Sequence, residues 1–199
     1  MKEVMLNDTT KIYVAKIENY NKELLLKEFK TNFEFNSAIS TTGKIVVSGK
    51  QSIIVIHSKE INNIKTQCID FIETITNSND AMCHNTNWIY INDKNTADFF
   101  FHNHIQNKEI FLKNDWTYTF YLQMPNNLKD DEGYLLFKTD DGIIHKILPE
   151  EGDVIIFPAD LLHTPTLAPN STKERIVFGG AYTKLYTNVE YLKSKKSII

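Results

Sequence analysis

Residues 151–170 read EGDVIIFPADLLHTPTLAPN, a complete strand followed by a corner. Gly152 opens a turn, and the apolar run at 154–157 is typical of a buried strand. Pro158 ends the run, because proline cannot donate a hydrogen bond to a neighbouring strand. His163 follows five residues later. A corner between strand and turn at this point would direct the His163 imidazole back into the protein.

Similar short strands are predicted throughout the second half of the chain, from residue 87 onward. They are rich in β-branched and aromatic residues and are separated by turn residues. In order they read NWIYIN, FFFHNHI, WTYTFYLQM, GYLLFKTD, GIIHKIL, DVIIFP and RIVFGGAY. Before them, apolar residues at helical spacing predict helices at 20–30 and 59–77, and KIVVSGKQSIIVI between the helices reads as a hairpin or strand pair. The pattern predicts a mainly β protein with N-terminal helices, built as a β-sandwich or small barrel.

One domain is the simplest organisation for the 199 residues. The sequence contains no internal repeat, no low-complexity tract and no linker rich in Pro, Gly or Ser. We expect residues 1–86 to form a supporting region of helices and strands. Residues 87–185 are expected to form the β core that carries the functional site.

Composition and charge exclude several classes of protein. The chain is 42% hydrophobic and 24% charged, which is ordinary for a globular protein, and its net charge of −3 with scattered lysines argues against nucleic acid binding. Its apolar runs are far shorter than the roughly 20 residues of a membrane helix, and Lys2, Glu3 and Asp8 are unlike a signal peptide. Cys68 and Cys83 are too few for a disulfide framework. We expect a cytoplasmic protein and leave its oligomeric state open, a homodimer included.

FFFHNHI, residues 99–105, contains two histidines that flank one asparagine. Side chains two residues apart on a strand point to the same face, so His102 and His104 project together. Burying two imidazoles is costly unless each ring nitrogen finds a partner, and a metal ion is an effective partner. His163 is the best candidate for a third ligand. The alternative is a metal-free barrel in which hydrogen bonds satisfy the histidines.

The C-terminal half resembles the iron(II)- and 2-oxoglutarate-dependent oxygenases. The matching residues are GDVIIFPADLLHTPTLAPN and, further on, RIVFGGAY. In that family a double-stranded β-helix ends with a turn, a His ligand and then an Arg that leads into a strand. Lys and Arg total 22 in this chain, and Arg175 is the single arginine beside 21 lysines. The resemblance assigns Arg175 to the distal carboxylate of 2-oxoglutarate, a task that suits its planar fork better than a lysine.

The middle of the chain is similar to the prolyl-hydroxylase-like members of the same superfamily. WTYTFYLQMPNN and EGYLLF resemble a strand pair in which a tyrosine lies near the same carboxylate. The resemblance assigns this role to Tyr121, with Thr119 on the same face of the strand. More narrowly, the ordered set of Trp88, HNH, FYLQMP, EGYLLF, FPADLLH and RIVFGG resembles an uncharacterised group of bacterial and phage oxygenases. The resemblance covers residues 87–183.

This resemblance implies a fold, a cofactor and a reaction. The fold would be a double-stranded β-helix, a jelly-roll or cupin-like barrel. The protein would be a dioxygenase that binds Fe(II), takes 2-oxoglutarate as cosubstrate and hydroxylates an unknown substrate, with succinate and carbon dioxide as products. Similarity to prolyl hydroxylases favours a peptide or an amino-acid side chain as that substrate.

The metal motif departs from the pattern of the family. Most members bind iron through His-x-Asp or His-x-Glu and a distal His. Here His104 stands two residues after His102, where the carboxylate is usual. We expect a three-histidine face of His102, His104 and His163. The alternatives are two histidines with a water or an anion, or an acid from elsewhere, such as Glu109 or Asp115.

Two rival interpretations use the same residues. In cupins, a related class of barrel, the first metal motif is His-x-His, then three or four intervening residues, then Glu, which would make Glu109 a fourth ligand. Asp160 and Trp116 stand where that pattern usually has glycine, and Arg175 is left without a role. The other rival is a barrel that only binds a small molecule or a protein, without redox chemistry.

Overall fold

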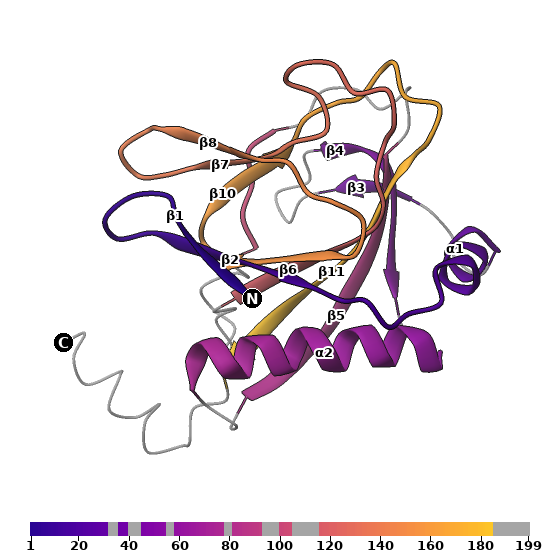
Figure 1. The fold of residues 1–199 in the computed structure, drawn as a ribbon, viewed down its shortest axis with the longest axis horizontal. Helices are drawn as coiled ribbons and strands as arrows, with labels where there is room; N and C mark the ends of the chain where they lie inside the picture. The colour runs from indigo at the N-terminus through magenta and orange to yellow at the C-terminus, as the bar shows by residue number, and fades with distance from the viewer. Residues whose placement is uncertain are drawn as a thin grey trace.

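The computed structural model describes residues 1–31, 36–39, 45–54, 58–77, 81–92, 100–104 and 116–184. These residues form two helices and eleven strands (Figure 1). In chain order they are β1 (Lys2–Met5), β2 (Lys11–Lys16), α1 (Lys22–Thr31), β3 (Asn36–Ile39), β4 (Ile45–Ile54), α2 (Lys59–Thr76), β5 (Ala81–Asn92), β6 (Trp116–Gln123), β7 (Leu135–Lys138), β8 (Ile144–Ile147), β9 (Asp153–Pro158), β10 (Leu162–Pro165) and β11 (Arg175–Lys184). The expectation of a mainly β protein with helices in its N-terminal half is confirmed.

The strands form two antiparallel sheets. The large sheet has eight strands in the order β1-β2-β9-β6-β11-β5-β4-β3, and the small sheet has the order β10-β7-β8. Over the described residues neither sheet closes on itself. The four strands that precede residue 81 belong to the same large sheet as β5, β6, β9 and β11.

The large sheet separates two apolar cores. One face packs against the helices, and Tyr118, Phe120 and Leu122 of β6 point to that side. The opposite face packs against the small sheet and carries Tyr121 of the same strand. Figure 1 shows α2 along one side of β5, β6 and β11, with β7, β8 and β10 on the other. Alternation along β6 therefore divides its side chains between the helix layer and the space between the sheets.

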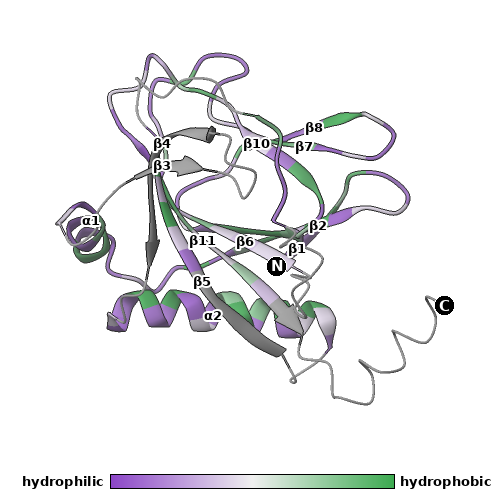
Figure 2. Ribbon diagram, turned by 180° about the vertical axis from the view of Figure 1, so that it is seen from behind, coloured by the Kyte–Doolittle hydropathy of each residue, from purple (hydrophilic) through white to green (hydrophobic). Residues whose placement is uncertain are grey.

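Helix α2 forms because its apolar residues recur on one face. Ile61, Ile64, Cys68 and Ile72 are buried against the large sheet, and Figure 2 shows hydrophobic and hydrophilic residues alternating along the helix. Its first turn is capped by Ser58, whose hydroxyl accepts a hydrogen bond of 3.1 Å from the Ile61 amide. Within the described residues, neither helix is long and apolar enough to cross a membrane.

Two sequence-based expectations about strands are wrong. KIVVSGKQSIIVI does not turn back at SGK, because β4 continues through it as one ten-residue strand that pairs with β3 on one side and β5 on the other. FFFHNHI does not form a regular strand either. Of its described residues, 100–104, only His102 pairs with another chain segment, in an isolated β-bridge to His163.

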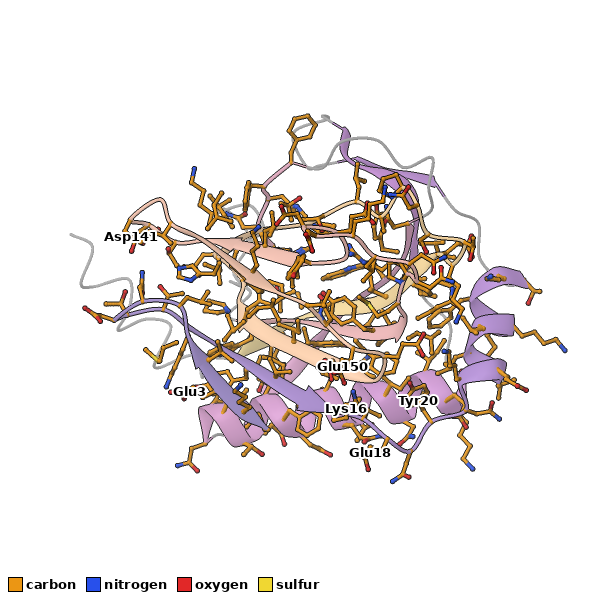
Figure 3. The ribbon with its side chains drawn as sticks, turned by 45° about the horizontal axis from the view of Figure 1, so that its top comes forward. Glu3, Lys16, Glu18, Tyr20, Asp141 and Glu150 are labelled. Carbon is orange, nitrogen blue, oxygen red and sulfur yellow. The ribbon has the colours of Figure 1, made fainter. Side chains whose placement is uncertain are left out.

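The turn before β9 connects the sheet to the pocket described below. Gly152 has φ +87°, in the left-handed region that favours glycine, and its amide donates to the Tyr121 carbonyl over 2.8 Å. The Gly152 carbonyl accepts a 2.9 Å hydrogen bond from the Ile17 amide. Figure 3 shows Lys16 and Glu150 close together here, in an ion pair of 3.1 Å. The hydrogen bond from Gly152 therefore fixes the backbone of Tyr121, whose side chain lines the pocket.

Candidate metal centre and anion pocket

Three histidines from two chain segments meet beside the small sheet. His163 lies on β10, and the segment 100–104 runs next to that strand. The His102 amide donates to the His163 carbonyl over 3.1 Å, and the His163 amide donates back to the His102 carbonyl over 2.9 Å. The His104 amide donates to the Ala159 carbonyl over 2.8 Å. These backbone bonds hold both HNH histidines next to His163.

The three imidazoles converge on one point. One ring nitrogen from each of His102, His104 and His163 lies within 4.8 Å of the others. The ring of His163 is 4.4 Å from that of His102 and 5.0 Å from that of His104, centroid to centroid. Imidazole nitrogen is a good ligand for iron, zinc, copper and nickel. The structure thus brings together all three histidines that the sequence analysis singled out, in a geometry that can hold a metal ion.

Main-chain carbonyls set the tautomers of two of these histidines. Nδ1 of His102 lies 3.1 Å from the Phe100 carbonyl oxygen, and Nδ1 of His163 lies 3.0 Å from the Leu161 carbonyl oxygen. A carbonyl oxygen can only accept, so both Nδ1 atoms carry the hydrogen. The Nε2 lone pairs are then left for a ligand. This is the usual arrangement behind a metal-binding histidine.

Burial keeps the three imidazoles neutral. Desolvation lowers the pKa of His102, and it lowers the pKa of His163 well below its usual value. Desolvation, with a contribution from neighbouring His102, lowers the pKa of His104 to about 3. Neutral imidazole is the form that binds metal, so the site is ready for a cation at neutral pH.

The depressed pKa values predict an acid-sensitive metal-free protein. The unfolded chain binds protons on these histidines below about pH 6.5, whereas the folded chain does not until its lower pKa values are reached. The stability that the neutral histidines contribute is therefore fully present above about pH 6.5, and it is lost as the pH falls below that value. For His104 alone, the free energy of unfolding should fall by about 1 kcal/mol between about pH 7.5 and about pH 5.5.

Urea unfolding of the metal-free protein at these two pH values measures this loss. The matched control is His104→Gln, which removes one of the titrating groups and should show a smaller dependence on pH. Equal pH dependence in the two proteins would contradict the assignment of the effect to His104.

The histidines form one end of a pocket between the two sheets. Its cavity volume is about 90 Å³, and its walls come from β5, β6 and β11 of the large sheet and from β7 and β10 of the small sheet. The lining residues are Trp88, Tyr90, His102, His104, Thr119, Tyr121, Leu135, His163, Pro165, Arg175 and Val177. No acidic residue is among these described lining residues. The pocket is thus suited to an anion rather than to a second cation.

Arg175 is the charged group of this pocket. Arg175 is 2% exposed, and none of its three guanidinium nitrogens has a hydrogen-bond partner among the described residues. Burial lowers its pKa, while nearby Tyr121 and Tyr90 act in the opposite direction. A buried cation without a counter-charge is costly, because the water that solvated it is not replaced. The arrangement therefore favours an anion that enters the pocket.

The two residues assigned beside Arg175 line the same pocket. Tyr121 is 2% exposed, and burial raises its pKa, so that its phenol stays protonated and can donate a hydrogen bond. Thr119 lies two residues earlier on β6 and faces the same way. The alternative metal ligands Glu109 and Asp115 lie outside the described residues.

Trp88 and Tyr90 of β5 line the pocket, a role that the sequence analysis did not give them. They are cross-strand partners of Gly179 and Val177, and Asn92 is the partner of Arg175. Alternation along NWIYIN could have placed these side chains on one face. It could not have shown that β5 lies beside β11, because pairing between strands so far apart in sequence leaves no local signal.

Comparisons with known proteins give matches among solved structures. No family model matches the sequence, and no curated protein sequence matches it. A prolyl-4-hydroxylase from Pseudomonas putida aligns with a TM-score of 0.64 at 14% identity, covering 89% of this chain and 94% of that one. The chain shares its fold with this prolyl-4-hydroxylase.

Two further prolyl hydroxylase structures also align with this chain. A prolyl hydroxylase from Trichoplax adhaerens, in complex with a hypoxia inducible factor peptide fragment, aligns with a TM-score of 0.64 at 17% identity and covers 94% of this chain and 88% of its own. A viral collagen prolyl hydroxylase from Paramecium bursaria Chlorella virus-1, as its 2OG complex, aligns at 0.57 and 15% identity, with 87% and 97% covered. At such identities the likeness to 2-oxoglutarate oxygenases establishes the fold, and the function has to be argued from the site.

Proposed function

We propose that this protein is an iron(II)- and 2-oxoglutarate-dependent dioxygenase whose two sheets are the halves of a double-stranded β-helix. The observation that carries the proposal is Arg175, whose buried guanidinium has no hydrogen-bond partner among the described residues and shares one pocket with three convergent histidines. A metal ion explains the histidines, and an anion explains the arginine. A 2-oxo dicarboxylate satisfies both, because one end chelates a metal and the other carries a free carboxylate.

The residues present fit iron(II). His102, His104 and His163 would bind it through their ring nitrogens, and three ligands on one face leave the opposite face open to a cosubstrate. When bound, iron(II) supplies the oxidative chemistry in which 2-oxoglutarate and dioxygen yield succinate, carbon dioxide and a hydroxylated product. The protein's own contribution is geometry, charge and the exclusion of water.

Arg175, Tyr121 and Thr119 would bind the far carboxylate of the cosubstrate. The guanidinium offers a planar pair of donors to it, and the protonated phenol of Tyr121 offers another. Apolar walls from Leu135, Pro165 and Val177 keep the pocket poor in water and so strengthen these charged contacts.

The three-histidine face has a consequence for charge. A neutral His104 in place of a carboxylate leaves the metal with its full double charge, and Arg175 adds one more positive charge to the same pocket. A dianionic cosubstrate offsets most of this charge. We infer that His104 makes the site more dependent on its anionic cosubstrate than a site with a carboxylate ligand.

The substrate class that we propose is a peptide or an amino-acid side chain. The support is the likeness of the fold to prolyl hydroxylases, one of which is in complex with a peptide fragment. The titration with 2-oxoglutarate described next does not depend on which substrate class is correct.

An anaerobic titration tests the proposed function. Iron(II) is added to the metal-free protein first, and 2-oxoglutarate second. The weak visible band of a 2-oxo acid chelated to iron(II) is expected to grow to saturation with 2-oxoglutarate. Succinate, which lacks the 2-oxo group, is the matched control and should give no band. A folded protein that binds iron(II) but never develops the band would refute the oxygenase proposal.

A further inference from the structure

His104 lies in a stack of three groups that closes one end of the pocket. Its ring centroid is 4.7 Å from that of Trp88, and the two rings are within 20° of parallel. Behind the indole lies Gly179 of β11, the cross-strand partner of Trp88. A Cβ at Gly179 would come within 2.5 Å of two atoms of the indole. The absence of a side chain at Gly179 therefore creates the space in which Trp88 can lie flat beneath His104.

The glycine that follows has the same use on the other face of the sheet. A Cβ at Gly180 would lie 2.4 Å from the Tyr118 hydroxyl, which donates to the Asn87 side-chain oxygen over 2.7 Å. The pair of glycines thus lets one aromatic ring press against β11 from each side. Only the ring on the pocket side reaches a candidate metal ligand.

We propose that Trp88 is a positioning residue that holds His104 in place as the third metal ligand, with Gly179 as the residue that makes room for it. The proposal rests on the metal site of the proposed function. His102 and His163 have their rings oriented by hydrogen bonds from Nδ1 to main-chain carbonyls. The flat face of the Trp88 indole lies against the His104 ring and restricts its rotation.

The stack also stabilises His104 more when it binds a metal ion than when it does not. A metal ion withdraws electron density from the imidazole that binds it, and the face of an indole is electron-rich. The attraction between the two rings is therefore larger when His104 carries a metal than when it does not. Trp88 then contributes to metal affinity without touching the metal.

Calorimetric titration with cobalt(II), which is stable in air and accepts imidazole ligands, tests the proposal. Trp88→Leu keeps an apolar side chain but removes the aromatic face, and it should weaken cobalt(II) binding about 10-fold. Trp88→Phe retains a ring and should recover most of the affinity. Trp116→Phe is the matched control, because Trp116 contacts Tyr13 in the helix-side core at 5.9 Å and should leave the affinity unchanged.

A double-mutant cycle separates positioning from a general structural role. In the His104→Ala background, Trp88→Leu should have no further effect on cobalt(II) affinity, because its only route to the metal has been removed. An equal loss in both backgrounds would overturn the proposal, and so would a Trp88→Leu protein that binds cobalt(II) as tightly as the wild type. If Trp88→Leu does not fold, Gly179→Ala, which displaces the indole, gives the same cycle.

The test of Trp88 and the test of the proposed function can fail independently of each other. A wild-type protein that binds cobalt(II) but not 2-oxoglutarate would refute the oxygenase, and the cycle would still decide the role of Trp88. A wild-type protein that binds no cobalt(II) would overturn both.

Discussion

Replacing Arg175 with methionine is expected to weaken binding of 2-oxoglutarate strongly and, at the same time, to stabilise the ligand-free protein. Arg175 is 2% exposed, and its three guanidinium nitrogens have no hydrogen-bond partner in the described part of the chain, so folding removes its hydration without replacing it. Methionine has a similar length and no charge. Substitutions of this kind raise the free energy of unfolding by about 1–3 kcal/mol when the buried charge is poorly compensated. Urea unfolding in the absence of metal and cosubstrate measures this gain.

The loss of 2-oxoglutarate affinity also follows from the buried charge of Arg175. Removing one partner of a buried, hydrogen-bonded charge pair costs about 2–5 kcal/mol, so 2-oxoglutarate affinity should fall about 30-fold or more. Metal affinity should be unchanged, because Arg175 is not among the three converging histidines. Titration of the chelate band with 2-oxoglutarate gives the first quantity, and cobalt(II) calorimetry gives the second.

Two variants control for charge and for position. Arg175→Lys keeps the positive charge but loses the planar fork, so it should bind 2-oxoglutarate with intermediate affinity and gain no stability. Lys173→Met removes an exposed charge two residues away and should change neither quantity. An Arg175→Met protein that is less stable than the wild type would show that the guanidinium has a structural partner. Unchanged 2-oxoglutarate affinity would exclude it from the cosubstrate site.

Much of the pocket was predictable because its residues lie in short, locally ordered segments. The apolar run before Pro158 places His163 on a corner, and Arg175 stands out as the single arginine at the start of a strand. Alternation along β6 sends Tyr121 and Thr119 to the same side. The local chain and the period of a strand give these positions, whereas the roles of Arg175, Tyr121 and Thr119 came from the resemblance to the 2-oxoglutarate oxygenases.

The pairing of distant segments was not predictable in the same way. His102 and His104 were placed together by strand alternation, yet residues 100–104 form a single bridge and not a strand. Backbone hydrogen bonds to His163 and Ala159 bring the two histidines together instead. The role of Trp88 was missed for the same reason, since it depends on the register between β5 and β11. Local periodicity says which face a residue occupies, but not which strand lies beside it.

Replacing His163 with alanine is expected to cause the largest loss of metal affinity of any single substitution. The His163 ring is closer to each of the other two rings, at 4.4 Å and 5.0 Å, than they are to each other, at 5.4 Å, and its Nε2 is 3.2 Å from Nε2 of His104. Its ring is 5% exposed and packs against Phe157 with centroids 4.6 Å apart, and among the described residues the cluster contains only two other potential ligands, His102 and His104. Affinity for cobalt(II) should fall at least about 100-fold, more than the loss expected for a supporting residue. The chelate band with iron(II) and 2-oxoglutarate should disappear.

The control for this prediction is His145→Ala. His145 of β8 is also paired with Phe137, as His163 is, but it contacts Thr139 and is not part of the metal cluster. Its removal should leave cobalt(II) affinity unchanged, which separates a loss of ligation from a loss of packing in the small sheet. A His163→Ala protein that still binds cobalt(II) tightly would mean that the ligands come from elsewhere, with Glu109 the first to test. Weaker cobalt(II) binding in His163→Ala and in His104→Ala, but unchanged binding in Glu109→Ala, would assign the site to three histidines. An imidazole would then occupy the position where most oxygenases of this fold carry a carboxylate.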